Sequence, residues 1–148
     1  MPLEEMVPPQ PRVLMVEDHR DIADLYQLKL QLEGYHVAVA SDGVAGLEMA
    51  RTLLPDVTVL DIHVPQLDGL QVLAALRGDR ATQDIPVIVC SEDDNPQVIK
   101  EAQRLGAVAY LVKANLLPSR LSKTVGDVLG QRGEFTVRAD GPGARKAS

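Results

Sequence analysis

Residues 56–61 read Asp-Val-Thr-Val-Leu-Asp, a short apolar run that ends on a carboxylate, and three other runs share this design. Residues 12–18 (RVLMVED) end on two acids, residues 85–91 (IPVIVCS) on a serine, and residues 107–113 (AVAYLVK) on a lysine. Short β-branched runs separated by helix-like stretches are typical of parallel strands that are buried on both faces. Because ligands bind beyond the carboxyl ends of such strands, we expect these polar residues to meet at one edge of the sheet.

A further strand at residues 36–40 completes five strands that alternate with five helices. Apolar residues recur at helical spacing after the first strand, at Ile22, Leu25, Leu28 and Leu32. The other four helices begin at residues that favour a helix start: Asp42, Asp68 and Asp94 or Asn95 are candidate caps, and Pro118 starts the last helix. This alternation predicts an α/β protein with a doubly wound, five-stranded parallel sheet.

The composition bounds the class of protein. The 148 residues, 45% hydrophobic and 24% charged, suffice for one soluble domain with a core. A net charge of −6, with 3% aromatic residues, argues against a nucleic-acid partner. The apolar stretches are shorter than a membrane span and no apolar signal segment follows Met1, so we expect a cytoplasmic protein without membrane contact. The single cysteine, Cys90, is expected to be a buried small hydrophobe.

Three segments are predicted along the chain. Residues 1–11 contain four prolines and are expected to form a flexible lead-in. Residues 12–130 form the compact domain. Residues 131–148 are expected to be a flexible tail, although residues 135–137 have the composition of a short strand or docking segment.

The polar residues at the strand ends suit phosphoryl transfer. Glu17, Asp18 and Asp61 supply the hard oxygen ligands that Mg²⁺ prefers, and a divalent cation would relieve their mutual repulsion. Asp61 can attack phosphorus and form an aspartyl-phosphate. Lys113 would place a positive charge on one phosphate oxygen, and Ser91 would donate a hydrogen bond to another.

Residues 13–18, 59–69, 86–91 and 106–113 together resemble the receiver domain of two-component response regulators. The resemblance covers about residues 12–130 and includes Pro65 and the pair Asp68-Gly69 after the central strand. It implies a flavodoxin-like (βα)5 fold with strand order 2-1-3-4-5.

The resemblance also implies roles for individual residues. Asp61 would be the phosphoacceptor, and Mg²⁺ would be held by Glu17, Asp18, Asp61 and the backbone carbonyl of His63. Lys113 and Ser91 would assist at the phosphoryl group, and Ser91 and Tyr110 would form a switch pair. The phosphodonor would be a histidine kinase or a histidine phosphotransfer protein.

Three positions depart from the family pattern. Glu92 stands where a small residue is usual, and its carboxylate should disfavour anionic small phosphodonors. Ala114 replaces the usual proline after Lys113, so we expect a trans peptide bond there. His63 lies two residues after Asp61, and we expect its ring to be solvated.

The favoured interpretation is a stand-alone receiver, a phosphorylation-driven binding switch and not an enzyme, because only about 18 residues follow the last helix. No DNA-binding output domain is expected. The partner surface, for a homodimer or an unidentified target, would lie on the fourth helix, fifth strand and fifth helix. It would include Lys100, Glu101, Arg104, Tyr110, Arg120 and Lys123. Kinase docking would involve the first helix, with Ile22 and Tyr26, and the loop around Leu116 and Pro118.

Two other interpretations stay open. One is a magnesium-dependent phosphatase with Asp61 as nucleophile, although His63 stands where such enzymes often carry a second acid. The other is a degenerate receiver that acts as a constitutive interaction module. The chain could also be cut from a longer protein.

Overall fold

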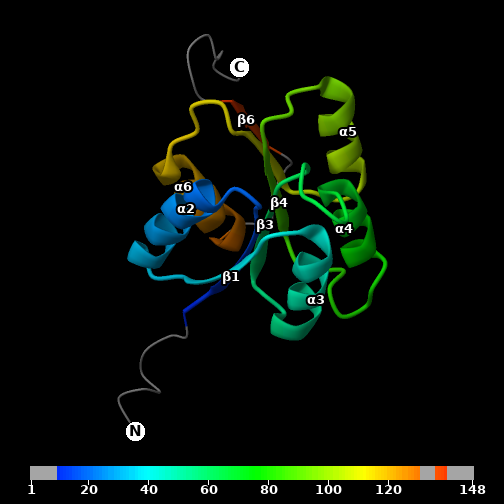
Figure 1. The fold of residues 1–148 in the computed structure, drawn as a ribbon, viewed down its shortest axis with the longest axis horizontal. Coiled ribbons are helices and arrows are strands. Elements are labelled where there is room, and N and C mark those ends of the chain that lie inside the picture. The colour runs from blue at the N-terminus through cyan, green and yellow to red at the C-terminus, as the bar shows by residue number, and fades with distance from the viewer. Residues whose placement is uncertain (1–9, 131–135, 140–148) are drawn as a thin grey trace, which may run out of the picture.

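The computed structural model describes residues 10–130 and 136–139, in which strands and helices alternate along the chain (Figure 1). The strands are β1 (Arg12–Val16), β2 (His36–Ala40), β3 (Val57–Leu60), β4 (Val87–Ser91), β5 (Ala109–Val112) and β6 (Thr136–Ala139). The helices are α2 (Arg20–Leu32), α3 (Gly43–Leu53), α4 (Gly69–Arg77), α5 (Pro96–Arg104) and α6 (Pro118–Gly130). The strands and helices expected within residues 12–130 are therefore present.

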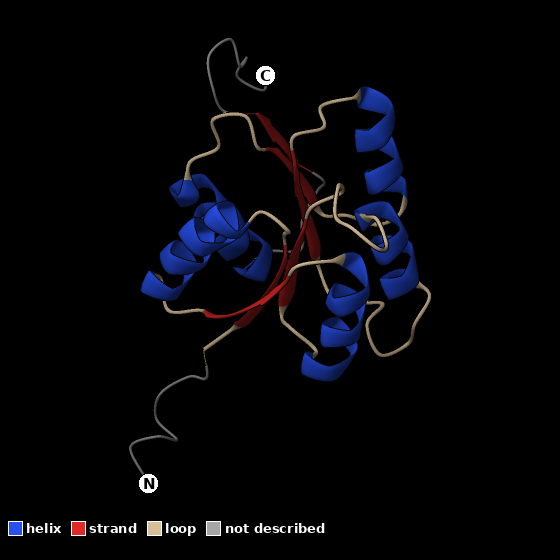
Figure 2. Cartoon of the chain, in the orientation of Figure 1, coloured by secondary structure: helices blue, strands red, loops and turns tan. Residues whose placement is uncertain are grey.

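All strands lie parallel in one sheet with the order β2-β1-β3-β4-β5-β6. The predicted order 2-1-3-4-5 is confirmed. Helices cover both faces of the sheet, with α2 and α6 on one side and α3, α4 and α5 on the other (Figure 2). This doubly wound arrangement brings the carboxyl ends of all the strands to one edge.

The core has two layers because the strand side chains alternate between the two faces of the sheet. In β1, Val13 and Met15 pack in the layer beneath α2 and α6, whereas Leu14 and Val16 pack in the layer beneath α3, α4 and α5. All four side chains are at most 1% exposed. A strand that is buried on both faces has a continuous apolar sequence, which is the pattern from which the sheet was predicted.

The apolar stripe from which helix α2 was predicted is not the stripe that the helix buries. Its buried residues are Ala23, Tyr26 and Leu30. Three apolar residues of the stripe noted in the sequence are instead exposed: Leu25 (54%), Leu28 (55%) and Leu32 (75%). The helix was predicted correctly, but its contact with the sheet uses a nearly opposite face.

The predicted helix caps are largely as expected. Asp42 accepts a hydrogen bond from the backbone of Ala45 at 2.8 Å. Asp68 forms a reciprocal capping box with Gln71 at the start of α4. Of the two candidates before α5, Asn95 is the cap, and Pro96 occupies the first turn.

A sixth strand extends the sheet beyond β5. β6 pairs with β5 in parallel, with Tyr110 opposite Val137. The expectation of a flexible tail over residues 131–148 was therefore wrong for residues 136–139, where the less favoured short strand forms. Residues 131–135 and 140–148, like residues 1–9 of the expected lead-in, lie outside the described residues.

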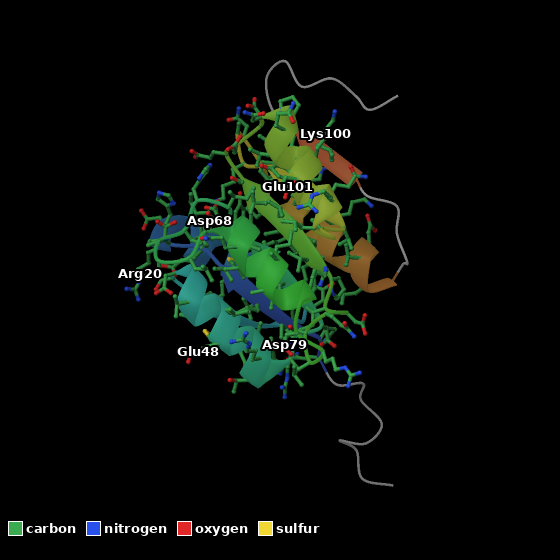
Figure 3. All side chains as sticks on the ribbon, turned by 90° about the vertical axis from the view of Figure 1, so that its right-hand side faces the viewer. Arg20, Glu48, Asp68, Asp79, Lys100 and Glu101 are labelled. Carbon is green, nitrogen blue, oxygen red and sulfur yellow. The ribbon has the colours of Figure 1, made fainter. Side chains whose placement is uncertain are left out.

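The outer surface of the α3, α4 and α5 layer is charged. Figure 3 looks onto this layer and shows Glu48, Asp79, Lys100 and Glu101 on its outer side. An ion pair of 3.1 Å between Arg51 and Asp79 links α3 to the segment after α4. In the part of the chain that the structure describes, no helix has the length and apolar character needed to cross a membrane.

Candidate functional site

The backbone at the strand ends is fixed by hydrogen bonds that continue the sheet beyond the strands. The backbone N–H of Asp61 donates to Val16 at 3.0 Å, and that of Lys113 donates to Ser91 at 2.8 Å. Glu17 is held in the same way by a carbonyl of β2 at 2.9 Å. The residues predicted to carry the chemistry therefore begin from rigid positions and not from free loops.

Asp61 is also positioned by the loop that follows it. The backbone N–H of His63 donates to Oδ1 of Asp61 at 3.0 Å. Gly69 donates to the carbonyl of Ile62 at 2.8 Å and approaches so closely that a Cβ there would lie 2.3 Å from the carbonyl oxygen of Asp61. Only glycine fits this approach, so the start of α4 holds the Asp61 segment in place.

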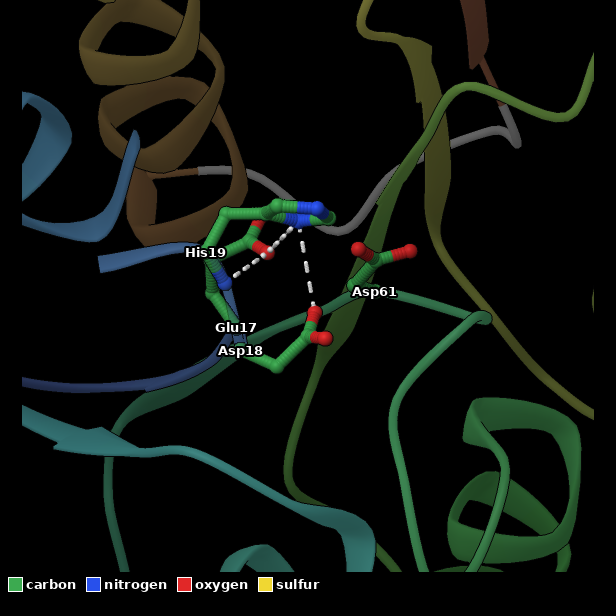
Figure 4. A group of neighbouring side chains, drawn as sticks. All are labelled: Glu17, Asp18, His19 and Asp61. Carbon is green, nitrogen blue, oxygen red and sulfur yellow. Dashed lines mark hydrogen bonds and ion pairs between the residues drawn. The ribbon is translucent and has the colours of Figure 1, made fainter. Parts of the chain in front are cut away.

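Glu17, Asp18 and Asp61 form a carboxylate cluster together with His19 (Figure 4). One ligand atom from each of the four residues lies within 4.8 Å of the others. Mg²⁺ prefers hard oxygen ligands, and three carboxylates supply them here. The donor set therefore fits the predicted ion. His19 was missed in the sequence, although its place directly after Glu17-Asp18 was a usable signal.

Lys113 lies against two of these carboxylates. Its Nζ donates to Oδ2 of Asp61 at 2.8 Å and also to Oε1 of Glu17. The three side chains are at most 6% exposed. Burial alone would lower the pKa of Lys113, but the hydrogen bonds and charges of Asp61 and Glu17 outweigh it and raise the pKa. Lys113 is therefore held as a cation beside Asp61.

Ser91 and Tyr110 are joined through Asp93. Both side chains are fully buried. The hydroxyl oxygen of Ser91 accepts from the backbone N–H of Asp93 at 3.2 Å, and the hydroxyl of Tyr110 donates to the carbonyl of Asp93 at 2.5 Å. Burial raises the pKa of Tyr110 to about 12. The prediction that Tyr110 contributes to a partner surface was wrong, because its ring lies inside the protein.

Asp93 also contacts His63, which was expected to be solvated. The ring is exposed, but its Nε2 lies 3.1 Å from Oδ2 of Asp93. A hydrogen bond from the backbone of Asn95 lowers the pKa of Asp93, and the His63 side chain lowers it further. Asp93 was not singled out in the sequence, because nothing in its local pattern indicates contacts with residues as distant as His63 and Tyr110.

The two other departures from the family pattern lie at the rim. Glu92 is exposed, as is Ala114. No peptide bond among the described residues is cis, so the expected trans bond between Lys113 and Ala114 is confirmed. Cys90 is 3% exposed, and burial raises its pKa to about 12, which agrees with the expected small buried hydrophobe.

The predicted kinase-docking residues are only partly accessible. Tyr26 is 6% exposed and donates to the carbonyl of Leu116 at 3.2 Å, and Leu116 is 7% exposed. Ile22 and Pro118 are half-buried. The expectation that Tyr26 meets a partner was wrong, because its side chain packs α2 against the loop before α6. Docking on the loop around Leu116 and Pro118 stays a prediction.

Comparison with known proteins gives a consistent result. A family model described as the response regulator receiver domain matches residues 13–125. The DNA-binding dual master transcriptional regulator RpaA of Synechocystis sp. is 38% identical over 103 residues, covering 70% of this chain and 43% of that protein. The transcriptional regulatory protein PrrA of Mycobacterium tuberculosis is 38% identical over 123 residues, covering 83% of this chain and 52% of that protein. The chain thus spans about half the length of these relatives.

Solved structures show the same likeness. The receiver domain of the putative response regulator NarL from M. tuberculosis is 33% identical, with a TM-score of 0.76, and covers 84% of this chain and 100% of that one. The chemotaxis response regulator CheY4 of Vibrio cholerae is 29% identical, with a TM-score of 0.75, over 80% and 98% of the two chains. The family model that matches residues 13–125, together with these similarities in sequence and fold, shows that this chain belongs to the response regulator receiver domain family.

Proposed function

We propose that this receiver accepts a phosphoryl group on Asp61 from a histidine kinase or a histidine phosphotransfer protein and thereby changes a protein-binding surface. The observation that carries the proposal is the position of Asp61, whose buried carboxylate lies 2.8 Å from Lys113 and within the carboxylate cluster. A carboxylate oxygen of Asp61 attacks phosphorus, and the imidazole of the donor leaves as the bond to it breaks.

Each residue of the site has a role in this transfer. Lys113 can follow the developing negative charge, because its ammonium already touches Asp61 and needs little reorganisation. Glu17 and Asp18, together with Asp61 and the carbonyl of His63, would hold Mg²⁺. When bound, the ion neutralises charge on the carboxylates and on the incoming phosphoryl oxygens.

The contacts of Ser91 provide a route from the site to the surface. If its hydroxyl turns toward a phosphoryl oxygen on Asp61, it gives up the bond from the backbone of Asp93. Asp93 is also the acceptor for Tyr110, so its loop between β4 and α5 would shift with the side chain. The surface that responds would lie on α5, β5 and α6. Among the predicted residues there, Lys100, Arg104 and Lys123 are exposed.

Intact-mass measurement tests the transfer. Wild type, Asp61→Asn and Asp56→Asn would be incubated with Mg²⁺ and a phosphorylated kinase core or a small phosphodonor. Asp56 is a matched control, because it is an exposed aspartate at the other end of β3. We expect one phosphoryl group on wild type and on Asp56→Asn, and none on Asp61→Asn.

Other outcomes would support the rival interpretations. Folded wild-type protein that gains no phosphoryl group from any donor would favour a degenerate interaction module. Rapid multiple turnover of the donor would favour a phosphatase.

A further inference from the structure

His19 brings an imidazole nitrogen to the carboxylate cluster. Its Nδ1 lies 3.2 Å from Oε2 of Glu17 and 3.4 Å from Oδ1 of Asp18 (Figure 4). Donor atoms that bind one octahedral ion at about 2.1 Å are about 3 Å apart when they occupy adjacent positions. The distances from Nδ1 to the two carboxylate oxygens are therefore close to those expected if all three atoms bound the same ion.

The two oxygens of Glu17 are divided between different neighbours. Oε1 accepts from Lys113, whereas Oε2 accepts from the backbone N–H of His19 at 3.1 Å and also faces its ring. Lys113 therefore occupies one side of the carboxylate cluster and His19 the other. A cation on the His19 side would meet Oε2 of Glu17 without first displacing the ammonium of Lys113.

Apart from its contacts with Glu17 and Asp18, the ring of His19 has no evident role in holding α2. The residue is the N-cap of α2, but its side chain makes no capping hydrogen bond. Its backbone carbonyl, which any residue would supply, accepts from Ala23 at 2.9 Å. The side chain is 64% exposed. Replacing it should therefore leave the fold intact.

We propose that His19 acts as a nitrogen ligand that shifts the divalent-cation preference of this site from Mg²⁺ toward transition metals such as Ni²⁺, Co²⁺ and Zn²⁺. The inference rests on the proposed function, because it requires that the carboxylates hold a divalent cation. Imidazole binds these metals well, whereas Mg²⁺ keeps oxygen ligands and water. One added nitrogen should therefore raise transition-metal affinity and leave Mg²⁺ affinity almost unchanged.

Calorimetric titration of tag-free protein with Mg²⁺ and with Ni²⁺ measures this preference. His19→Ala should weaken Ni²⁺ binding at least about tenfold, the size of effect seen when the surroundings of a metal site are damaged. It should change Mg²⁺ binding less than about twofold, because Mg²⁺ gains little from imidazole. His36→Ala is the matched control, because His36 is an exposed histidine at the start of β2. It should leave both affinities unchanged.

A spectroscopic measurement tests the bond itself. Electron spin echo envelope modulation of bound Mn²⁺ detects a coordinated imidazole nitrogen. We expect nitrogen modulation in wild type and in His36→Ala, and its loss in His19→Ala. Equal modulation in wild type and His19→Ala, or its absence from wild type, would overturn the proposal.

Asp18→Asn separates failure of this inference from failure of the proposed function. If Mg²⁺ binds wild type and not Asp18→Asn, while Ni²⁺ affinity is the same with and without His19, only the role of His19 is wrong. If Mg²⁺ does not bind wild type at all, the magnesium-dependent function fails as well.

Discussion

Lys113 balances the charge of the site in the absence of a cation. Its ammonium is the partner of two buried carboxylates, Glu17 and Asp61, that would otherwise repel each other. Because it is positively charged, the same ammonium also disfavours a divalent cation at the other oxygens of these carboxylates. Lys113 therefore affects both the stability of the fold and the affinity for metal.

Lys113→Met should lower the free energy of unfolding by roughly 3 kcal/mol without Mg²⁺, because it leaves buried carboxylates without their cation. Added Mg²⁺ should restore more stability in this variant than it adds to wild type, since the competing ammonium is gone. Urea unfolding with and without Mg²⁺ measures both effects. Lys123→Met is the control, because that lysine is exposed and pairs with Asp127 on the same helix, a contact worth below about 1 kcal/mol. Equal stabilisation of Lys113→Met and wild type by Mg²⁺ would contradict the competition.

The residues of the site differed in how well the sequence revealed them. Asp61 and Lys113 were predictable, because each directly follows a buried strand and parallel strands bring such residues to one edge. Asp93 was not predictable, because its importance comes from contacts with His63 and Tyr110 that depend on the conformation of a loop. Tyr110 was placed on the surface because the family resemblance assigns the fifth strand to the partner face, and this does not show how far a single aromatic ring is buried.

At the scale of elements, α2 shows the limit of pattern analysis. Two apolar stripes run along this helix, one through Leu25 and Leu28 and one through Ala23, Tyr26 and Leu30. Both have helical spacing, and they differ by a rotation of about 160° around the helix axis. The sequence predicts the helix from either stripe, but the shape of the neighbouring surface decides which one is buried.

The start of α4 is the element that holds the Asp61 segment, and two glycines test this. Gly69→Ala should lower the free energy of unfolding by about 2 kcal/mol, because its Cβ would overlap the backbone of Asp61. Gly126→Ala in α6 should raise it by up to about 1 kcal/mol, since the nearest atom is 3.5 Å away and alanine favours the helix. Thermal or urea unfolding of both variants gives the comparison. A Gly69→Ala variant as stable as wild type would show that the Asp61 segment is not held this way.

Across the whole molecule, stability should fall in alkaline solution. Burial raises the pKa of Tyr26, Tyr110 and Cys90 to about 12, whereas the unfolded chain releases these protons at lower pH. Between about pH 9 and pH 12 the native state therefore binds more protons than the unfolded state, and the free energy of unfolding decreases as pH rises. The contribution of these groups is fully present below about pH 8, where neither state has released the protons.

Urea unfolding at intervals between pH 8 and pH 11.5 measures this decline. The expected slope is on the order of 1 kcal/mol per pH unit for each group while it titrates only in the unfolded chain. Tyr26→Phe should make the slope shallower, although it also removes the hydrogen bond to Leu116. A free energy of unfolding that stays constant over this pH range would contradict the argument.

The sixth strand has a consequence for any partner that would pair with the edge of β5. That edge is already occupied by β6, which is joined to α6 through residues 131–135. So short a tether gives the segment an effective concentration of about millimolar or more at its own docking position. An external strand of equal intrinsic affinity would have to exceed that concentration to replace it. A partner at the β5 edge must therefore bind more tightly than β6 does. Otherwise it must bind the flanking helices and leave β6 in place.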